Sequence, residues 1–187
     1  MSKAFTSEEA ADGPLVVPAR APLPDGVKNY VTPRGLDLLH AEAADLDAER
    51  VRLDADRSDE AERRNRLGVL DQQIADLAGR IRGARVLDAS KQPAGEVRFG
   101  ATVTLCARTA DGGAGEERRY TIVGVDEADA GEGRVAFVSP IARVLVGKRV
   151  GETALLRTAR GEEALEITAI AYDADPGGGA AQAGGAG

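Results

Sequence analysis

Two runs of apolar residues, each with the alternating three- and four-residue spacing of a coiled-coil seam, constrain this chain more than any other feature. Residues 54–62, between the runs, contain no apolar side chain larger than alanine. Two apolar stripes joined by a short polar stretch predict an antiparallel helical hairpin with an acidic tip. Arg50 occupies one seam position, which either an acid across the seam or a snorkelling side chain would accommodate. The seam residues are Leu36, Leu39, Ala43, Leu46 and Leu53 in the first run, and Leu67, Leu70, Ile74, Leu77, Ile81 and Ala84 in the second.

Local signals predict where the two helices begin and end. Thr32 can cap the first helix, and Pro33 suits its first position because the missing N–H costs nothing there. This helix is expected to run to about Asp54, a length of roughly 33 Å at 1.5 Å per residue. The second helix is expected from near Ser58 to about Leu87.

The pattern of apolar residues changes from helical to strand-like at residue 96. Alternating apolar residues, separated by Gly-rich turns, are typical of short antiparallel strands. We therefore predict a compact α+β domain with one helix against a mostly antiparallel sheet. The expected elements are a β-hairpin at 101–125, an acidic loop at 126–133, a strand at 135–137, a helix at 141–146, and strands at 153–158 and 165–171.

The remaining segments are assigned from composition. Residues 1–28 are rich in Ala, Pro, Gly and acids, which predicts a disordered or extended arm. Gly and Ala dominate residues 175–187, where we expect a disordered tail. The complete division is an arm at 1–28, a coiled-coil hairpin at 29–89, a linker at 90–95, an α+β domain at 96–174 and a tail at 175–187.

Composition and charge exclude several classes of function. The net charge of -7 argues against general binding to a phosphate backbone. Cys106 is the only cysteine, so no intrachain disulfide or cysteine metal cage can form, and its apolar surroundings predict burial. His40, the only histidine, lies within the first helix, away from any candidate nucleophile. No apolar run approaches transmembrane length, so we expect a cytoplasmic protein without a membrane partner.

Charged residues at the hairpin tip allow two interpretations. The acids can form an ordinary solvated turn, or two of them can lend ligands to a metal ion held by a partner. Arg63, Arg64 and Arg66 can balance these acids on a solvated face, or can contact a nucleic-acid phosphate. Composition and spacing alone therefore predict an interaction protein. The acids of the tip are Asp54, Asp56, Asp59, Glu60 and Glu62.

Several stretches of residues 28–173 resemble the bacterial Gre transcript-cleavage factors, and the GreB type most closely. Ser139-Pro140-Ile141-Ala142-Arg143-Val144-Leu145-Val146-Gly147-Lys148, followed by Val150-Gly151-Glu152, is the most specific of them. The order of a helical hairpin before a globular domain matches the family as well. The other similar stretches are 28–35, 97–100, 120–124, 126–129 and the tip motif 56–59.

The resemblance implies an FKBP-like globular domain that docks on the rim of the secondary channel of RNA polymerase. The hairpin would enter the channel, where Asp56 and Asp59 would help hold a second Mg²⁺ shared with the polymerase. The polymerase would then hydrolyse backtracked RNA by two-metal chemistry, so this chain would be neither an enzyme nor the owner of a cofactor. We expect a monomer that meets the 3′ end of the nascent RNA only indirectly. The docking residues would be Ser139, Pro140, Ile141 and Ala142.

Departures from the family pattern leave two interpretations of the function within this family. The first helix looks short by roughly ten residues, about 15 Å at 1.5 Å each. Glu60-Ala61-Glu62-Arg63 follows the second tip acid and lacks the aromatic residue of the family, and Gln72-Gln73 replaces a basic pair. The chain would either stimulate cleavage or bind the channel as a regulator without cleavage. A third reading, a peptidyl-prolyl isomerase or chaperone, rests only on the implied fold.

Overall fold

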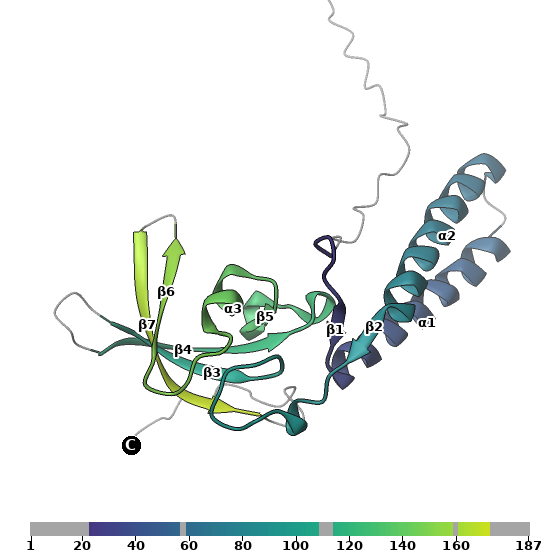
Figure 1. Cartoon of the computed structure of the whole chain (residues 1–187). Helices are drawn as coiled ribbons and strands as arrows, with labels where there is room; N and C mark the ends of the chain where they lie inside the picture. Colours follow the sequence, from purple (N-terminus) through teal and green to yellow (C-terminus); the bar gives the residue numbers. More distant parts are fainter. Residues whose placement is uncertain (1–22, 57–58, 109–113, 159–160, 173–187) are drawn as a thin grey trace, which may run out of the picture.

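The structure, a computed structural model, describes residues 23–56, 59–108, 114–158 and 161–172. It is a mixed α+β molecule, as predicted, in which a rod of two helices projects from one end of a curved sheet (Figure 1). The predictions for residues 1–22 and 173–187 fall outside the described residues. Within the described ranges, no helix is both long enough and apolar enough to cross a membrane.

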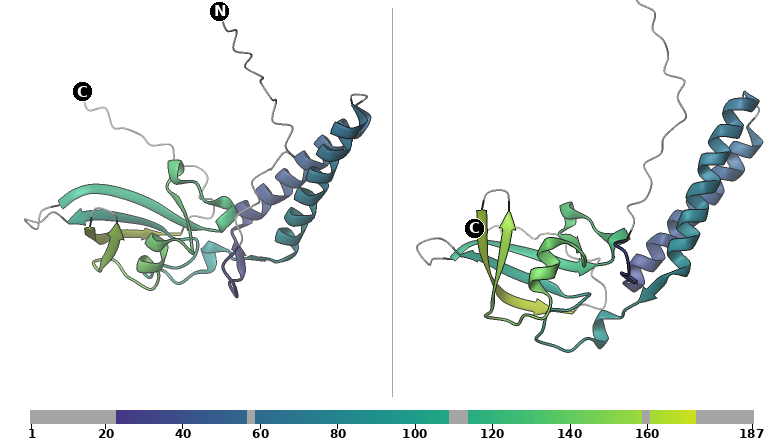
Figure 2. Two further views of the ribbon diagram at one scale, coloured as in Figure 1. Left: turned by 90° about the horizontal axis from the view of Figure 1, so that it is seen from above. Right: turned by 45° about the horizontal axis from the view of Figure 1, so that its top comes forward.

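The rod consists of α1 (Pro33–Ala55) and α2 (Glu60–Arg82), each 23 residues long. The two helices lie side by side in every view, and the last residues of α1 and the first residues of α2 lie at the end of the rod farthest from the sheet (Figure 2). The hydroxyl of Thr32 accepts a hydrogen bond from the backbone N–H of Gly35 at 2.8 Å, so the predicted cap is confirmed. The coiled-coil geometry of the seam stays a prediction. The most deeply buried leucines of the rod are Leu39, Leu53, Leu70 and Leu77.

Arg50, the polar residue in the seam, has an acidic partner, which is one of the two arrangements that the sequence allowed. Arg50 Nε donates to Asp71 Oδ1 across the helix pair at 2.6 Å. This contact holds the pKa of the guanidinium above its ordinary value, first through the hydrogen bond and then through the charge of Asp71. Because both side chains are about half exposed, the pair contributes little to stability.

The second helix ends five residues earlier than Leu87, the predicted end, because the chain enters a strand there. In place of the last helical turn, β2 (Ala84–Val86) pairs in parallel with β1 (Asn29–Val31). Val31 is 1% exposed and packs with Leu39 and Leu77, so this small sheet closes the base of the rod. Ala84 continues the heptad spacing of the second run, so the sequence assigned this segment to the helix and did not reveal the strand pair.

The globular part is a five-stranded sheet with the order β5-β4-β3-β7-β6. Its neighbours are antiparallel except β4 and β5, and the predicted hairpin at 101–125 is the β3–β4 pair. Helix α3 (Pro140–Leu145) packs on the core through Ala142 and Leu145, both fully buried. The strands are β3 (Thr102–Arg108), β4 (Ala114–Val123), β5 (Arg134–Ala136), β6 (Thr153–Thr158) and β7 (Gly161–Ala171), and the 3₁₀ turns are η1 (Ala89–Lys91), η2 (Val125–Glu127) and η3 (Ala130–Glu132).

Two local predictions for the globular part need correction. Cys106 is half-buried rather than core, because β3 turns Val103 and Leu105 inward and places Thr104 and Cys106 on its other face. The predicted linker at 90–95 is partly structured, since η1 extends into it. The FKBP-like topology stays a prediction.

Candidate functional site

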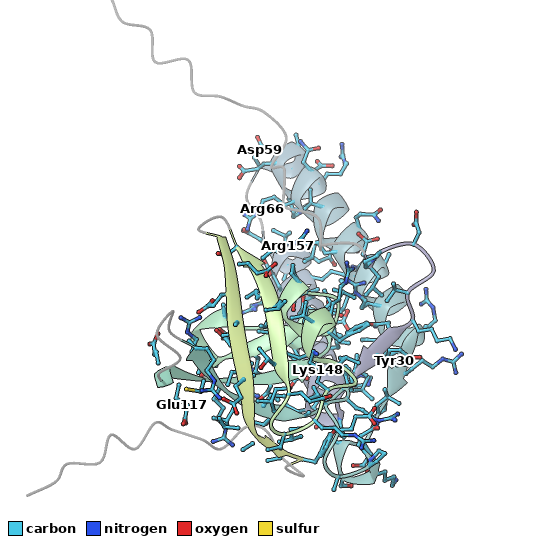
Figure 3. The ribbon with its side chains drawn as sticks, turned by 60° about the vertical axis from the view of Figure 1, so that its left-hand side comes forward. Tyr30, Asp59, Arg66, Glu117, Lys148 and Arg157 are labelled. Carbon is cyan, nitrogen blue, oxygen red and sulfur yellow. The ribbon has the colours of Figure 1, made fainter. Side chains whose placement is uncertain are left out.

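The tip of the rod places one of the two predicted metal-binding acids at a helix start. Asp59 is the N-cap of α2, and its Oδ1 accepts hydrogen bonds from the backbone N–H groups of Ala61 and Glu62 at 2.8 and 3.0 Å. These two bonds hold the pKa of the Asp59 carboxyl below its ordinary value. Figure 3 shows Asp59 at the end of the rod, remote from Tyr30 at its base. Helix α2 therefore begins at Glu60, one residue after Asp59 and close to the predicted start near Ser58.

The capping role of Asp59 can be separated from its charge. Asparagine caps a helix as well as aspartate does, whereas alanine removes the acceptor. We therefore expect Asp59→Ala to lower the thermal melting temperature and the helical circular dichroism signal, with Asp59→Asn close to wild type. Equal melting temperatures for the alanine and asparagine variants would contradict the capping role.

The other predicted metal ligand, Asp56, ends the first helix. It is the exposed C-cap of α1, and its backbone carbonyl accepts a hydrogen bond from Arg63 Nη1 at 2.7 Å. Arg63 thus bridges the two helices across the turn. Residues 57 and 58 of the turn fall outside the described residues.

The three arginines proposed as RNA contacts have different surroundings. Arg63 donates to the backbone carbonyl of Asp56 at the tip, and Arg64 pairs with Glu60 at 2.6 Å along the same helix. Arg66 is exposed on α2, below Asp59 in Figure 3. Of the three, Arg66 is therefore the best placed for a phosphate, and RNA contact by any of them stays a prediction.

Across the part of the chain that the structure describes, no three His, Cys, Asp or Glu side chains gather closely enough to hold an ion. Mg²⁺ keeps several waters and is commonly bound by one or two protein carboxylates together with other oxygen ligands. Coordination of a shared Mg²⁺ by Asp56 and Asp59 stays a prediction.

The predicted docking stretch opens helix α3, as the sequence indicated. Ser139 Oγ accepts a hydrogen bond from the backbone N–H of Ala142 at 3.3 Å, and Pro140 occupies the first helical position. Pro140 is exposed and Ile141 is half-buried against the core. The Ala142 side chain is fully buried, so it supports the helix and does not itself face a partner.

Beside α3 lies a groove that the sequence did not reveal, with a volume of about 450 Å³. Leu155 on the edge strand β6 is 53% exposed, whereas its neighbour Ala154 is fully buried. The sequence did contain one signal for this groove. Leu155 lies in a predicted strand, and alternation along that strand places its large apolar side chain on the face opposite the core. The groove is lined by Pro140, Arg143, Val144, Leu155, Leu156, Arg157 and Glu162.

A buried polar contact joins the rod to the globular part. The carboxylate of Glu127, in η2, accepts a hydrogen bond from the hydroxyl of Thr32, the N-cap of α1. The Glu127 side chain is 1% exposed, and Arg34 Nη1 approaches its Oε1 at 3.9 Å. A Cβ on Gly35 would lie 2.8 Å from Glu127 Oε2, so glycine is what lets the acid reach the helix start. Glu127, which lies in the predicted acidic loop, is therefore part of the joint between the rod and the globular part.

A second buried contact strengthens the joint. Arg80 Nε of α2 lies 3.1 Å from Asp126 Oδ2, and the two side chains are 10% and 5% exposed. Asn29 Nδ2 donates to the backbone carbonyl of Arg80 at 3.0 Å. Both helices of the rod are thus tied to η2, which sets the direction in which the tip projects (Figure 1).

Burial of Glu127 gives the joint a pH dependence with a definite sign. Desolvation raises the pKa of the Glu127 carboxyl above 4.5, and the opposing effects of Thr32 and of the distant Arg34 are smaller. The folded state therefore holds this proton more tightly than the unfolded chain does. The carboxyl favours folding most below pH 4.5, and this contribution is lost as the pH rises through the raised pKa.

Glu127→Gln tests this sign because it replaces the ionisable group with a neutral one of the same shape. Relative to the glutamine variant, the wild type should lose free energy of unfolding as the pH rises from 4.5 to neutral. Urea denaturation of both proteins across this range measures the difference. If the wild type instead gains stability relative to the variant over this range, the arginines lower the pKa of Glu127 by more than burial raises it.

Comparison with known proteins identifies the family. Residues 92–172 match the family model "Transcription elongation factor, GreA/GreB, C-term". Transcription elongation factor GreA of Phenylobacterium zucineum (strain HLK1) is 40% identical over 109 residues, which cover 58% of this chain and 67% of that protein. The chain belongs to the GreA/GreB family. GreA of Xylella fastidiosa (strain M12) is 42% identical over 110 residues, with the same coverage of both chains.

The resemblance inferred from the sequence is thus confirmed at the level of the family, whose members are transcription elongation factors. The GreB type stays a prediction, since both relatives carry the name GreA. Among solved structures, GreA/GreB from Nitrosomonas europaea is 19% identical and covers 78% of this chain and 100% of that chain, with a TM-score of 0.38. Gfh1 of Thermus thermophilus is also 19% identical, with coverage of 78% and 99% and a TM-score of 0.36.

Proposed function

We propose that this GreA/GreB-family protein docks on RNA polymerase through the α3–β6 groove and inserts its rod into the secondary channel. The observation that carries the proposal is the acid-tipped rod, held at a set angle to the globular part by two buried contacts. A rod fixed at its base delivers its tip to one place on a partner, which a freely hinged rod cannot do.

At the tip, Asp56 and Asp59 would contribute carboxylate oxygens to a Mg²⁺ held mainly by the polymerase. When bound, that ion would activate a water for hydrolysis of backtracked RNA. A carboxylate offers about four lone-pair positions, so the two cap bonds on Asp59 Oδ1 leave capacity for a cation. The bond from Arg63 to the Asp56 carbonyl keeps the end of α1 close to the start of α2. This chain positions ligands, and the polymerase remains the enzyme.

Docking would centre on the apolar surface formed by Pro140, Ile141 and Leu155. Pro140 and Leu155 line the groove, and Leu155 offers an exposed apolar anchor on an edge strand. Arg157 and Glu162, paired at 3.6 Å, lie at its polar edge. An apolar centre with charged residues at the rim is the usual anatomy of a protein interface.

Leu155→Asp tests the docking proposal because it places a charge at the centre of the groove. Binding to core RNA polymerase should weaken by about tenfold or more. Val150→Asp is the matched control, since Val150 is also 53% exposed and lies outside the groove. Fluorescence anisotropy measures the affinity, and thermal melting verifies that both variants fold. If the two folded variants bind polymerase with equal affinity, the groove is not the docking surface.

A second candidate function, a regulator that binds the channel without stimulating cleavage, is favoured by the length of the rod. Each helix has 23 residues, which corresponds to about 35 Å at 1.5 Å per residue. Direct coordination of Mg²⁺ requires ligand distances of about 2.1 Å, so a rod that stops short cannot supply a ligand. The cleavage measurement that closes the Discussion separates the two functions.

A further inference from the structure

A half-open pocket of about 530 Å³ lies where the base of the rod meets the globular part. Tyr30 of β1, Phe99 and Phe137 form one aromatic wall, and each is half-buried. The ring centroid of Phe137 lies 5.8 Å from those of Tyr30 and Phe99, in edge-to-face geometry. Rings in this arrangement fix one another and leave apolar surface on which a further ring can pack. Figure 3 shows Tyr30 at the base of the rod, far from Asp59 at the tip.

The polar lining of the pocket is cationic. Arg98 and Arg143 line it together with Gln92, and none of its nine lining residues is acidic, although the chain as a whole carries a net charge of -7. Arg98 Nη2 lies 3.1 Å from Glu96 Oε1, which neutralises part of its charge. Arg143 is exposed and forms no ion pair with any residue in the described ranges. Its guanidinium is therefore available to an anion.

We infer that this pocket binds a small aromatic molecule that carries one anionic group. The ring of the ligand packs against the aromatic wall, and its anion faces Arg143 and Arg98. A guanidinium presents paired N–H donors that match a carboxylate or a phosphate. A volume of about 530 Å³ lies within the range of small-molecule sites and accommodates two fused rings. Because Tyr30 belongs to β1 and the other contacts belong to the globular part, the ligand touches both parts of the molecule.

Titration of the full chain with 2-naphthoate, followed by NMR, tests this site. The signals of Tyr30, Phe99 and Phe137 should shift together and saturate. The neutral analogue 2-naphthalenemethanol should bind about fivefold more weakly, as expected for the loss of partly exposed charge contacts. A parallel titration with adenosine 5′-monophosphate tells whether an aromatic carboxylate or a nucleotide binds more tightly. These measurements do not involve RNA polymerase, so they test the ligand site separately from the proposed function.

Variants of the exposed arginines complete the test. Arg98→Gln and Arg143→Gln should each weaken binding of 2-naphthoate by about two- to fivefold and leave the neutral analogue unaffected. Arg157→Gln is the matched control, because it removes the same charge from the separate α3–β6 groove, where its side chain is 91% exposed. Arg98 is decisive because it lines only the pocket, whereas Arg143 borders both sites. Equal affinities for the anion and its neutral analogue, an unchanged Arg98→Gln, or shifts confined to the groove would each overturn the inference.

Discussion

Asp126→Ala should lower the free energy of unfolding by about 3–5 kcal/mol, the cost of leaving a buried charge without its partner. Arg80 and Asp126 are both nine-tenths buried, and their charged atoms lie 3.1 Å apart. Removing the carboxylate leaves the guanidinium where water cannot replace it. Because α2 supplies one partner and η2 the other, the loss also frees one side of the joint. Urea denaturation measures the change in free energy.

Two further variants distinguish a buried charge from a general loss of packing. Arg80→Met combined with Asp126→Leu replaces the pair with apolar side chains and should recover most of the lost stability. Glu60→Ala removes an acid from the Arg64 pair, in which both side chains are 73% exposed, and should change stability little. If Asp126→Ala destabilises the protein no more than Glu60→Ala does, the pair does not hold the joint.

Elements defined by local chemistry were predictable from the sequence. The heptad spacing located both helices, and a hydroxyl residue before proline marked the first residues of α1 and α3. Alternating apolar residues located β3, β5 and β7, and the Gly-containing turns beside them located β4 and β6. Of the two arrangements that the sequence allowed for Arg50, the structure shows the acid across the seam.

The joint was not predictable, because its partners are remote in the sequence. Thr32 and Glu127 are 95 residues apart, and no local pattern connects them. Asp126 and Glu127 looked like part of a solvated acidic loop, since acids are seldom buried unless they are paired. Gly35 makes room for the Glu127 carboxylate, a role that only the folded structure reveals. The groove beside α3 was missed for a related reason, since it needs β6 and α3 together.

Replacing Asp56 and Asp59 by asparagine should reduce stimulated RNA cleavage by about tenfold or more, because the amide is a poor ligand for Mg²⁺. The substitution keeps the shape of both side chains, and asparagine at position 59 still caps α2. The affinity for polymerase should stay nearly unchanged, since the proposed docking groove lies in the globular part. Raising Mg²⁺ should restore part of the activity, because a weakened site fills by mass action.

The most direct measurement is cleavage of the transcript in one backtracked elongation complex, with the wild type and the Asp56→Asn, Asp59→Asn double variant compared over a series of Mg²⁺ concentrations. The proposed function predicts that the wild type accelerates cleavage and that the variant falls well below it at low Mg²⁺ and approaches it as Mg²⁺ rises. Equal cleavage by both proteins would contradict it. The acids would then have no part in catalysis, and regulation without cleavage would be the function of the channel-bound protein.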